Sequence, residues 1–489
     1  MRRTCIPTLS ELTLSRLKPS NSPSQTVSIK EITMLEKNKD ARICIVGAGA
    51  GGLSTAYFLK KQGYRNVTVL EKSGRVGGLC CSITFDSRSF DLGANFLTPA
   101  YKEVLKMAEE VGAKLYSEEP GVAFDPSQST PDNPKYYTIL SAVTKGTTLV
   151  QFLLAVIRFF WERFKLDSII STPGFKGISK HPELTQPFLK WLESKDIVCL
   201  KALFEIPITA MGYGYLDEIP TVYALKYMTI KTFWTLVTYG ADIDLGWPKR
   251  FIDGFQRLWE RISWGINVKF NITIKEIKRG EKISVKFTDQ EQLINESDPR
   301  ERTEEFDYLV LACGLTRDVL NHFLDLSEEE KALFDKIVLN PYCLTSYVIE
   351  DLTLPNRVIN VVPLDQMANP WFIAQQFKDN QLIAFYSRTD IVEETKVKEK
   401  VLAGIQAAVE KLGGRIENPE DYYTFDLWPY FPHVSSQDMQ EGFYDRLEEL
   451  QGKQNTYYVG GLMNFELVET IVEYSKALVE KNFPLIRSK

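Results

Sequence analysis

The stretch that decides the fold lies early in the chain, where residues 43–63 read ICIVGAGAGGLSTAYFLKKQG. Its glycine-rich centre, residues 47–52, fits the pattern G-x-G-x-x-G between an apolar run and a helix-forming run. In such a turn Gly47 permits the reversal after a strand, Gly49 lets a pyrophosphate approach the backbone, and Gly52 lets the helix pack closely. The positive end of the helix then faces the phosphates. We therefore assign these loop residues to a dinucleotide cofactor: Gly47, Ala48, Gly49, Gly51 and Gly52.

The residues on either side of the turn extend the prediction to a doubly wound sheet. Residues 42–47 read as a buried strand, residues 52–62 as a helix and residues 66–71 as a second strand. Glu71 ends that second strand, 19 residues after Gly52, where a carboxylate can accept hydrogen bonds from both ribose hydroxyls. A free carboxylate at this place disfavours a 2′-phosphate, so the pattern argues against NADP.

The residues that follow Glu71 favour FAD over NAD. Residues 71–78 read EKSGRVGG, which places an arginine and two adjacent glycines directly after the strand. A second close approach of the backbone, with a cation beside it, suits the longer FAD molecule, whose pyrophosphate and ribityl chain extend past the first turn. The FAD contacts predicted from this segment are Glu71, Lys72, Arg75, Gly77 and Gly78.

Further pieces of the same sheet are predicted in the middle and at the end of the chain. Residues 306–314 read as a buried strand, and residues 457–459 as a last strand before a glycine pair and a closing helix from about residue 466. An aromatic, helix-rich segment and a segment of mixed strands and helices separate these pieces. We therefore predict a discontinuous FAD-binding domain of residues 39–120, 246–325 and 426–489, and a substrate-binding domain of residues 121–245 and 326–425.

The first 38 residues differ in composition from the rest of the chain, with many serines and few acids before Glu31. We expect residues 1–38 to be a disordered N-terminal extension or, because Met34 stands just before the first strand, the product of a misplaced start. A transit peptide is the alternative.

The set of motifs resembles the flavin amine oxidase superfamily over residues 40–489. Besides the glycine turn, residues 253–258, DGFQRL, are similar to its G-G-x-x-x-L segment, and residues 274–277, IKEI, to the strand whose backbone meets the adenine. The resemblance implies an α/β fold: a Rossmann-like, doubly wound FAD-binding domain of the p-hydroxybenzoate hydroxylase and amine oxidase type, with an inserted α+β substrate domain. It also implies cofactor contacts from Asn95, Ile274, Gly460, Gly461 and Met463.

Two further stretches resemble the bacterial polyunsaturated fatty acid double-bond isomerases, which act on linoleate. Residues 211–220 read MGYGYLDEIP, and residues 430–436 read YFPHVSS. The resemblance implies that flavin N5 takes a hydride from the methylene between two double bonds and returns it at another carbon. An FAD-dependent oxidase or dehydrogenase of an amine or small metabolite is the alternative on the same fold, and a non-catalytic flavin-binding protein is a third reading.

The same resemblance indicates which side chains surround the substrate. The contacts it implies are Phe96, Tyr213, Leu236 and Phe431. The helix-rich insert holds further aromatic residues that can build an apolar tunnel, although each taken singly also fits an ordinary core. His433 is the candidate catalytic or orienting residue, with a structural histidine as an equal alternative.

Two departures from the resembled pattern concern binding. Gly461 stands where the superfamily often has an acidic residue, which leaves open how a ribityl or pyrophosphate contact is supplied. Residues 114–124 contain no arginine, although the resembled isomerases hold the substrate carboxylate with one there. We therefore expect the head group to be bound differently, or not to be a free carboxylate.

The composition narrows the partners and the compartment. The 489 residues carry a net charge of −6, which argues against general binding to nucleic acid. Seven scattered cysteines without a C-x-x-C pair indicate reduced thiols and a cytoplasmic protein, and three separated histidines argue against a metal site. We expect a small-molecule, lipid substrate, and the sequence indicates no oligomeric state.

The most apolar run, residues 149–161, reads LVQFLLAVIRFFW and is interrupted by Gln151 and Arg158. It is too short for a membrane span, and we expect a mostly buried helix. The alternative is a helix that makes transient contact with a membrane surface, where a lipid substrate is found.

Overall fold

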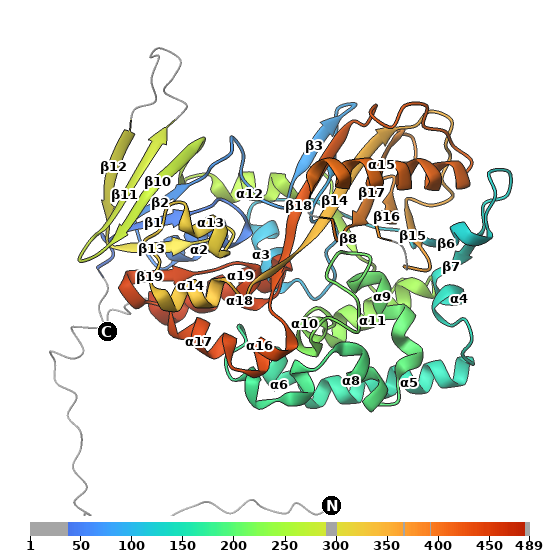
Figure 1. The fold of residues 1–489 in the computed structure, drawn as a ribbon, viewed down its shortest axis with the longest axis horizontal. Coiled ribbons are helices and arrows are strands. Elements are labelled where there is room, and N and C mark those ends of the chain that lie inside the picture. The colour runs from blue at the N-terminus through green and yellow to red at the C-terminus, as the bar shows by residue number, and fades with distance from the viewer. Residues whose placement is uncertain (1–37, 290–300, 365–366, 392, 485–489) are drawn as a thin grey trace, which may run out of the picture.

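The computed structural model describes residues 38–289, 301–364, 367–391 and 393–484. The predictions for residues 1–38 therefore lie outside the described residues, apart from the last of them. Two lobes built on β-sheets stand side by side, and a layer of helices lies beneath the right-hand lobe (Figure 1).

The left-hand lobe is built on a parallel sheet of five strands in the order β19-β13-β1-β2-β9. These strands are β1 (Arg42–Val46), β2 (Asn66–Leu70), β9 (Asn267–Lys269), β13 (Tyr308–Leu311) and β19 (Thr456–Tyr458). They come from the beginning, middle and end of the chain, which confirms the predicted doubly wound sheet. Ile43, Cys44 and Ile45 of β1 are fully buried, because both faces of a parallel sheet are covered.

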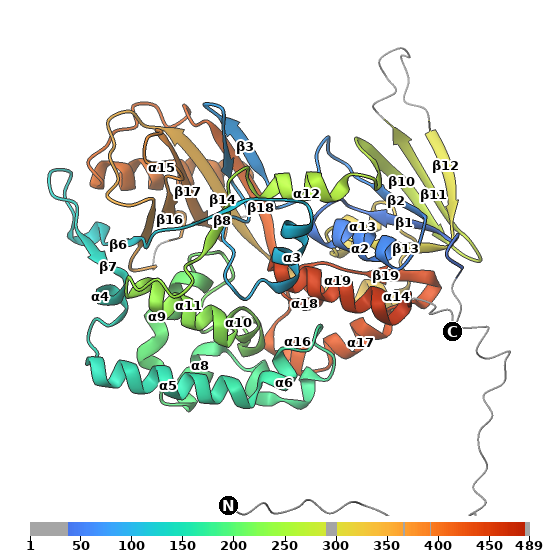
Figure 2. The same cartoon turned by 180° about the vertical axis from the view of Figure 1, so that it is seen from behind.

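Helices pack around this sheet (Figure 2). α2 (Ala50–Lys61) begins inside the glycine turn and packs against α19 (Val468–Asn482), the last described helix. The closing helix therefore starts near the predicted position, after a short preceding helix. The other helices of this lobe are α3 (Lys102–Glu110), α12 (Phe255–Ser263), α13 (Arg317–Asn321), α14 (Glu328–Phe334) and α18 (Gly461–Asn464).

Three smaller sheets are also present among the described residues. An antiparallel sheet of three strands holds β10 (Ile272–Arg279), β11 (Ile283–Asp289) and β12 (Glu301–Phe306). A hairpin pairs β3 (Ser82–Phe85) with β4 (Arg88–Asp91), and β5 (Leu115–Ser117) pairs with β8 (Lys249–Phe251). The β5–β8 pair joins segments that are more than a hundred residues apart in the chain, and it places part of the site described below.

The right-hand lobe is a sheet of seven strands in the order β18-β14-β17-β16-β15-β6-β7. Its strands are β6 (Val122–Phe124), β7 (Tyr136–Thr138), β14 (Val338–Val348), β15 (Val358–Val361), β16 (Pro370–Ala374), β17 (Leu382–Arg388) and β18 (Thr424–His433). α15 (Glu394–Lys411) packs on one face, while the other face carries a separate apolar cluster around Tyr342 and Phe372. The predicted domain boundary at residue 426 falls inside β18, which pairs with β14.

The helical layer is formed by the aromatic-rich insert and two later helices. Its members are α4 (Ile139–Val143), α5 (Leu149–Lys165), α6 (Asp167–Ile170), α7 (Pro182–Thr185), α8 (Phe188–Ser194), α9 (Lys201–Ile208), α10 (Thr221–Tyr227), α11 (Ile230–Gly240), α16 (Ser436–Gln440) and α17 (Phe443–Glu449). Phe159 of α5 lies with its ring centroid 4.1 Å from that of Phe233 and 5.1 Å from that of Phe204. These aromatic residues form the core of the layer and not a tunnel wall.

The prediction of a mostly buried helix at residues 149–161 is wrong in its main point. α5 buries Phe152, Val156 and Phe159, but it exposes an opposite face of equally apolar side chains. Because both faces are apolar, the sequence pattern does not reveal which of them meets the core. Across the described residues, no helix is long and apolar enough to cross a membrane.

Candidate FAD-binding and substrate site

The glycine turn after β1 contains the close approaches that its sequence predicts. Gly47 has a φ of +102°, and a Cβ on Gly52 would stand 1.9 Å from the Gly47 carbonyl oxygen. A Cβ on Gly51 would meet the backbone of Gly460 at 3.5 Å. The protein's own backbone therefore accounts for Gly47 and Gly52, whereas the contact at Gly51 is an ordinary van der Waals distance.

Gly49 differs from its neighbours, because the protein leaves the space beside it open. A Cβ there would meet only the Cα of Gly78, at 3.7 Å. Gly49 also forms a bridge with Gly77, so the second glycine pair lies directly against the turn. Arg75 Nη1 donates to the Gly78 carbonyl at 3.0 Å and fixes this second loop. The space between the two adjacent loops is lined by glycines, and it forms a cradle that fits a pyrophosphate.

Glu71 stands at the end of β2, beside the glycine turn. Its Oε2 accepts a hydrogen bond from the Ala48 amide at 2.7 Å. Its carbonyl accepts from the Ile272 amide at 2.9 Å, which brings β10 and Ile274 to this corner, while Lys72 is exposed beside it. Glu71 Oε1 accepts from the amide and the hydroxyl of Ser73, so of the about four acceptor positions of a carboxylate one remains for a ribose hydroxyl. This corner fits the adenosine end of a dinucleotide.

The last strand delivers a third glycine pair to the same region. Gly460, with a φ of +127°, lies against Gly51, and α18 carries the fully buried Met463. A Cβ on Gly461 would stand 1.7 Å from a carboxylate oxygen of Glu466. Glu466 thus folds back into the space that an acidic side chain at position 461 would fill. Burial raises the pKa of Glu466 to about 7.

A continuous row of aromatic rings, called the aromatic row below, begins next to Glu466. It runs in the order Phe465, Tyr213, Tyr430, Tyr342, Tyr386, Phe372 and Phe96, with successive ring centroids 4.7–6.2 Å apart. Such spacings are those of direct edge and offset ring contacts. Burial raises the pKa of Tyr213, Tyr342 and Tyr430 well above the usual range, so these hydroxyls remain protonated. The row is therefore rich in π-faces and uncharged near neutral pH.

The aromatic row ends at a buried arginine. Arg250, on β8, holds its guanidinium 4.1 Å from the Phe96 ring centroid and donates from Nε to Glu118 Oε2 at 2.5 Å. The Arg250 and Glu118 side chains are only 1% and 0% exposed. A second arginine, Arg357, lies 4.0 Å from the other oxygen of Glu118. Among the described residues, Arg250 Nη2 and Arg357 Nε have no hydrogen bond partner, so both can donate to a ligand.

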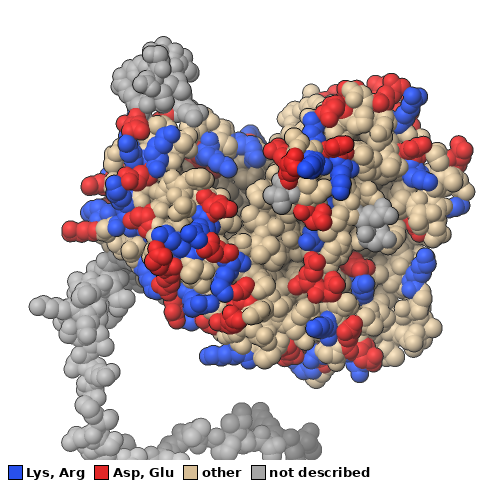
Figure 3. Space-filling view, in the orientation of Figure 1, with Lys and Arg blue, Asp and Glu red and all other residues tan. Residues whose placement is uncertain are grey.

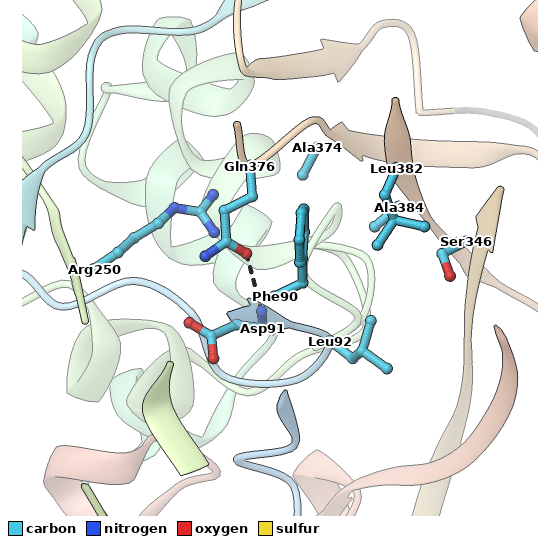
Figure 4. Close-up of a pocket in the computed structure, with 9 residues that line it drawn as sticks. All are labelled: Phe90, Asp91, Leu92, Arg250, Ser346, Ala374, Gln376, Leu382 and Ala384. Carbon is cyan, nitrogen blue, oxygen red and sulfur yellow. Dashed lines mark hydrogen bonds between the residues drawn. The ribbon is translucent and has the colours of Figure 1, made fainter. Parts of the chain in front are cut away.

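A small cavity lies beside Arg250 (Figure 4). One side is polar, with Arg250, Gln376 and Asp91, whose amide donates to Gln376 Oε1 at 2.9 Å. The other lining residues are mostly apolar: Phe90, Leu92, Ser346, Ala374, Leu382 and Ala384. Burial raises the pKa of the Asp91 carboxyl to about 6. The cavity is narrow, and it places the Arg250 guanidinium and the Asp91 carboxyl beside an apolar lining.

His433 lies one ring away from the aromatic row. Its imidazole stacks on Phe431 at a centroid distance of 4.6 Å, and its Nδ1 lies 2.7 Å from the Phe431 carbonyl oxygen. Burial lowers the pKa of His433, so the ring is neutral at physiological pH. Phe431 in turn contacts Tyr213 at 5.2 Å and Phe465 at 5.4 Å. This geometry suits a residue that orients Phe431.

Phe431 and Phe465 share an unusual backbone conformation. Their φ angles are 52° and 80°, and among the described residues no other aromatic residue has a positive φ. This conformation costs a non-glycine residue about 1–3 kcal/mol, and such residues concentrate at functional sites. Both lie where the aromatic row meets the predicted cofactor.

The structure brings most of the predicted substrate contacts together. Phe96, Tyr213 and Phe431 lie in or against the aromatic row, whereas Leu236 is half-buried on α11 in the helical layer. Asn95, predicted to meet the cofactor, donates to the Tyr386 hydroxyl at 3.3 Å and thus borders the row.

Three residues of the site have no motif that could have revealed them: Arg250, Arg357 and Glu466. The pairing of β5 with β8 sets Arg250 opposite Tyr116, which lies within residues 114–124, the stretch that contains no arginine. A guanidinium thus reaches this stretch from a distant strand.

Charged side chains of both signs are interspersed over the face seen in Figure 3. No patch of a single sign dominates that face. It therefore offers no extended basic surface of the kind that nucleic acid binding requires.

The comparisons with known proteins agree with this geometry. The family model for flavin containing amine oxidoreductases matches residues 50–337. The polyenoic fatty acid isomerase of Ptilota filicina is 38% identical over 223 residues, which are 41% of this chain and 43% of that protein. Protoporphyrinogen oxidase 2 of Arabidopsis thaliana is 41% identical over 80 residues, 16% of each chain. These matches span less than half the length of the curated relatives.

Solved structures extend the likeness to nearly the whole chain. The CLA-producing fatty acid isomerase from P. acnes superposes with a TM-score of 0.76 at 24% identity, over 92% of this chain and 100% of that one. Cyclohexylamine oxidase from Brevibacterium oxydans IH-35A gives 0.59 at 13%, over 90% and 99%. The fold is thus the α/β amine oxidase type, with FAD as the cofactor. Because the family model covers more than half of its length, the chain belongs to the flavin containing amine oxidoreductase family.

Proposed function

We propose that this chain isomerises double bonds of a polyunsaturated fatty acid. The observation that carries the proposal is the aromatic row, which leads from the glycine pair at Gly460 to the buried guanidinium of Arg250. Bound FAD supplies a hydride acceptor that takes a hydride from the methylene between two double bonds and returns it at another carbon of the same chain. The substrate is neither oxidised nor reduced overall, since the hydride that leaves is the hydride that returns.

The aromatic row provides what the acyl chain needs during this exchange. Loss of a hydride leaves a positive charge spread over the former diene, and each aromatic face near it contributes about 0.5–2 kcal/mol of cation–π attraction. The apolar surface also excludes water, which would otherwise attack the cation. Because the tyrosine hydroxyls of the row stay protonated, they do not act as bases that remove a proton from it.

The buried charges at the far end suit a carboxylate head group. Arg250 and Arg357 both face Glu118, and Asp91 lies close enough to interact with Arg250, so the proposal rests on the unfilled donors of the arginines and not on an excess of positive charge. The unpartnered Arg250 Nη2 offers the directed hydrogen bond that a carboxylate takes from a guanidinium. We infer that Arg250 takes the role of the arginine that residues 114–124 lack.

His433 acts in this proposal as an orienting residue. A carbonyl oxygen only accepts, so the contact with Phe431 requires the proton on Nδ1. The neutral ring then holds Phe431 against Tyr213 and Phe465 at the cofactor end of the row.

A second candidate is an FAD-dependent oxidase of an amine or small metabolite. The observation that favours it is Asp91, whose Oδ2 is buried and has no hydrogen bond partner among the described residues. An ammonium group could pair with that oxygen. The resemblance in fold to cyclohexylamine oxidase is compatible with this chemistry and does not distinguish it from isomerisation.

An anaerobic absorbance time course of the FAD-loaded protein separates the two candidates. With linoleate, the isomerase proposal expects growth of conjugated-diene absorbance while the flavin spectrum stays oxidised, and no oxygen uptake in air. Bleaching of the flavin by cyclohexylamine or another amine, with recovery in air and no diene formed from linoleate, would support the oxidase instead. Methyl linoleate is the matched control, because it keeps the diene and removes the charge that Arg250 would bind.

A further inference from the structure

The outer face of α5 is the most apolar exposed surface of any described helix. We use this name for Leu149, Val150, Leu153, Leu154, Ile157, Trp161 and Phe164, each of which is 49–67% exposed. Single exposed apolar residues need no explanation, but seven on one helix of 17 residues form a patch. The buried face of the same helix already supplies its packing, so the outer face is not needed for the core.

The outer face carries no charged residue. At 100° per residue its seven side chains fall within an arc of about 140°. Arg158 and Lys165 lie at the margin of that arc, where Arg158 pairs with the exposed Asp196 at 2.8 Å, and Lys145 is exposed just before the helix. Glu162 lies on the far side and is paired with Lys165 and Lys195. An apolar stripe with cations at its margins is the pattern of a helix that lies in a membrane interface.

Neighbouring side chains extend the patch. Trp161 stacks on Phe164 with ring centroids 6.5 Å apart. Trp234, on α11, is 45% exposed and its ring centroid lies 6.0 Å from that of Phe160. Tryptophan is enriched at the level of lipid head groups, where one part of its ring is in apolar surroundings and its N–H remains hydrated.

We propose that the outer face of α5 docks on the surface of a lipid bilayer that contains anionic lipids. The helix lies along the lower edge of the molecule in both ribbon views, together with α6 and α8 (Figures 1 and 2). The docked helix would lie parallel to the bilayer, with Trp161 and Phe164 among the acyl chains. Arg158, Lys165 and Lys145 would then meet the lipid phosphates at its margins.

The dimensions of the patch favour a bilayer over a second copy of the chain. A helix of 17 residues is about 25 Å long and about 10 Å wide, so its outer face is a narrow convex ridge. A stable protein dimer needs close complementarity of shape across its interface, which such a ridge offers only to a matching groove. A fluid bilayer surrounds a narrow convex ridge without a matching surface, and its anionic lipids complement the marginal cations.

Flotation of the FAD-loaded full chain with lipid vesicles tests this proposal. The chain should float with vesicles of phosphatidylcholine and phosphatidylglycerol, and less with phosphatidylcholine alone. A variant with Leu154→Gln, Ile157→Gln and Trp161→Gln should bind the vesicles at least about tenfold more weakly, because it removes three apolar side chains that the bilayer would bury. The control variant carries Val319→Gln and Val338→Gln, which change two exposed apolar residues in other parts of the molecule.

Several results would overturn the proposal. One is failure of the wild-type chain to float with anionic vesicles, and another is that the triple variant floats as well as the wild type. A third is a wild-type dimer that the three substitutions abolish. FAD retention reports whether each variant is folded. Trp161→Phe is a milder change: if Trp161 enters the bilayer, brominated lipids should quench the wild-type chain more than this variant. Equal quenching of the two would count against the proposal. These outcomes do not depend on which substrate the enzyme accepts.

Discussion

Substitution of Arg250 should affect stability and substrate binding in ways that a second substitution separates. Arg250→Met leaves Glu118 fully buried, with only Arg357 at 4.0 Å to balance its charge. Removal of one partner from a buried ion pair costs about 3–5 kcal/mol of unfolding free energy. Because Arg357 still balances part of the Glu118 charge, we expect the unfolding free energy to fall by about 3 kcal/mol. Urea unfolding followed by circular dichroism measures it.

Removal of both charges should restore most of this loss. Replacement of a buried ion pair by apolar side chains of similar volume is often neutral or stabilising, because the cost of burying two charges is avoided. The double variant Arg250→Met with Glu118→Leu should therefore unfold with a free energy within about 1–2 kcal/mol of the wild type. The single variant Glu118→Leu should be the least stable, since it leaves Arg250 buried and unpaired.

The double variant then isolates the role of Arg250 in binding. A hydrogen bond to a charged group contributes about 1.5–3 kcal/mol, so KM for linoleate should rise about 10-fold to 150-fold, with kcat changed much less. KM for methyl linoleate should not change. Arg261→Met, which removes a partly exposed arginine of α12 paired with Asp253, is the control and should alter neither constant. A stable double variant with wild-type KM for linoleate would refute the assignment of the head group to Arg250.

Three further predictions concern the cofactor and the buried carboxyls. Gly49→Val should fold but purify without FAD, because the added side chain fills the open space beside Gly78. Gly52→Ala should instead lower the stability of the fold, because its Cβ would collide with the Gly47 carbonyl oxygen. FAD absorbance after gel filtration and a thermal melt distinguish the two variants. Gly461→Ala should weaken FAD retention, because its Cβ would stand 1.7 Å from a Glu466 oxygen, and this loss should shrink in a Glu466→Ala background; equal losses in both backgrounds would contradict it. Burial raises the pKa of Glu469 from 4.5 to about 7, so the folded chain holds a proton that the unfolded chain has lost between these values. This carboxyl alone should therefore lower the unfolding free energy by about 3 kcal/mol from pH 4.5 to pH 7. The fall over this range should be about that much smaller in Glu469→Gln than in the wild type, and an equal fall in both would be the contrary result.

The part of the fold that the sequence predicts well is the part set by neighbouring residues. The strand, glycine turn and helix at residues 43–63 follow from apolar runs and glycines that are adjacent in the chain, and they appear within two residues of the predicted bounds. Glu71 and the glycine pair at residues 77–78 also lie where the pattern places them. Each prediction needed only the local geometry of a strand that turns into a helix.

The residues that the sequence did not reveal depend on long-range pairing or on the tertiary environment. Arg250 reaches the site because β8 pairs with β5, and no local pattern specifies that pairing. Glu466 takes the place of a side chain at position 461 only because the backbone reverses at Phe465, whose φ is 80°. For α5 the local pattern was clear, but two apolar faces made its orientation ambiguous.

The aromatic row also bears on why one fold supports both oxidation and isomerisation. Both begin with departure of a hydride toward the flavin, and they differ in what the substrate cation meets next. An oxidase completes its reaction when the cation loses a proton or meets water. Along this row the tyrosine hydroxyls stay protonated, because burial raises their pKa, so they are poor bases. Glu466 titrates near pH 7, but its carboxyl faces Gly461 at the cofactor corner. In the isomerase that we propose, a cation held against such a wall would have the returning hydride as its available partner, and the chemistry would then close as an isomerisation.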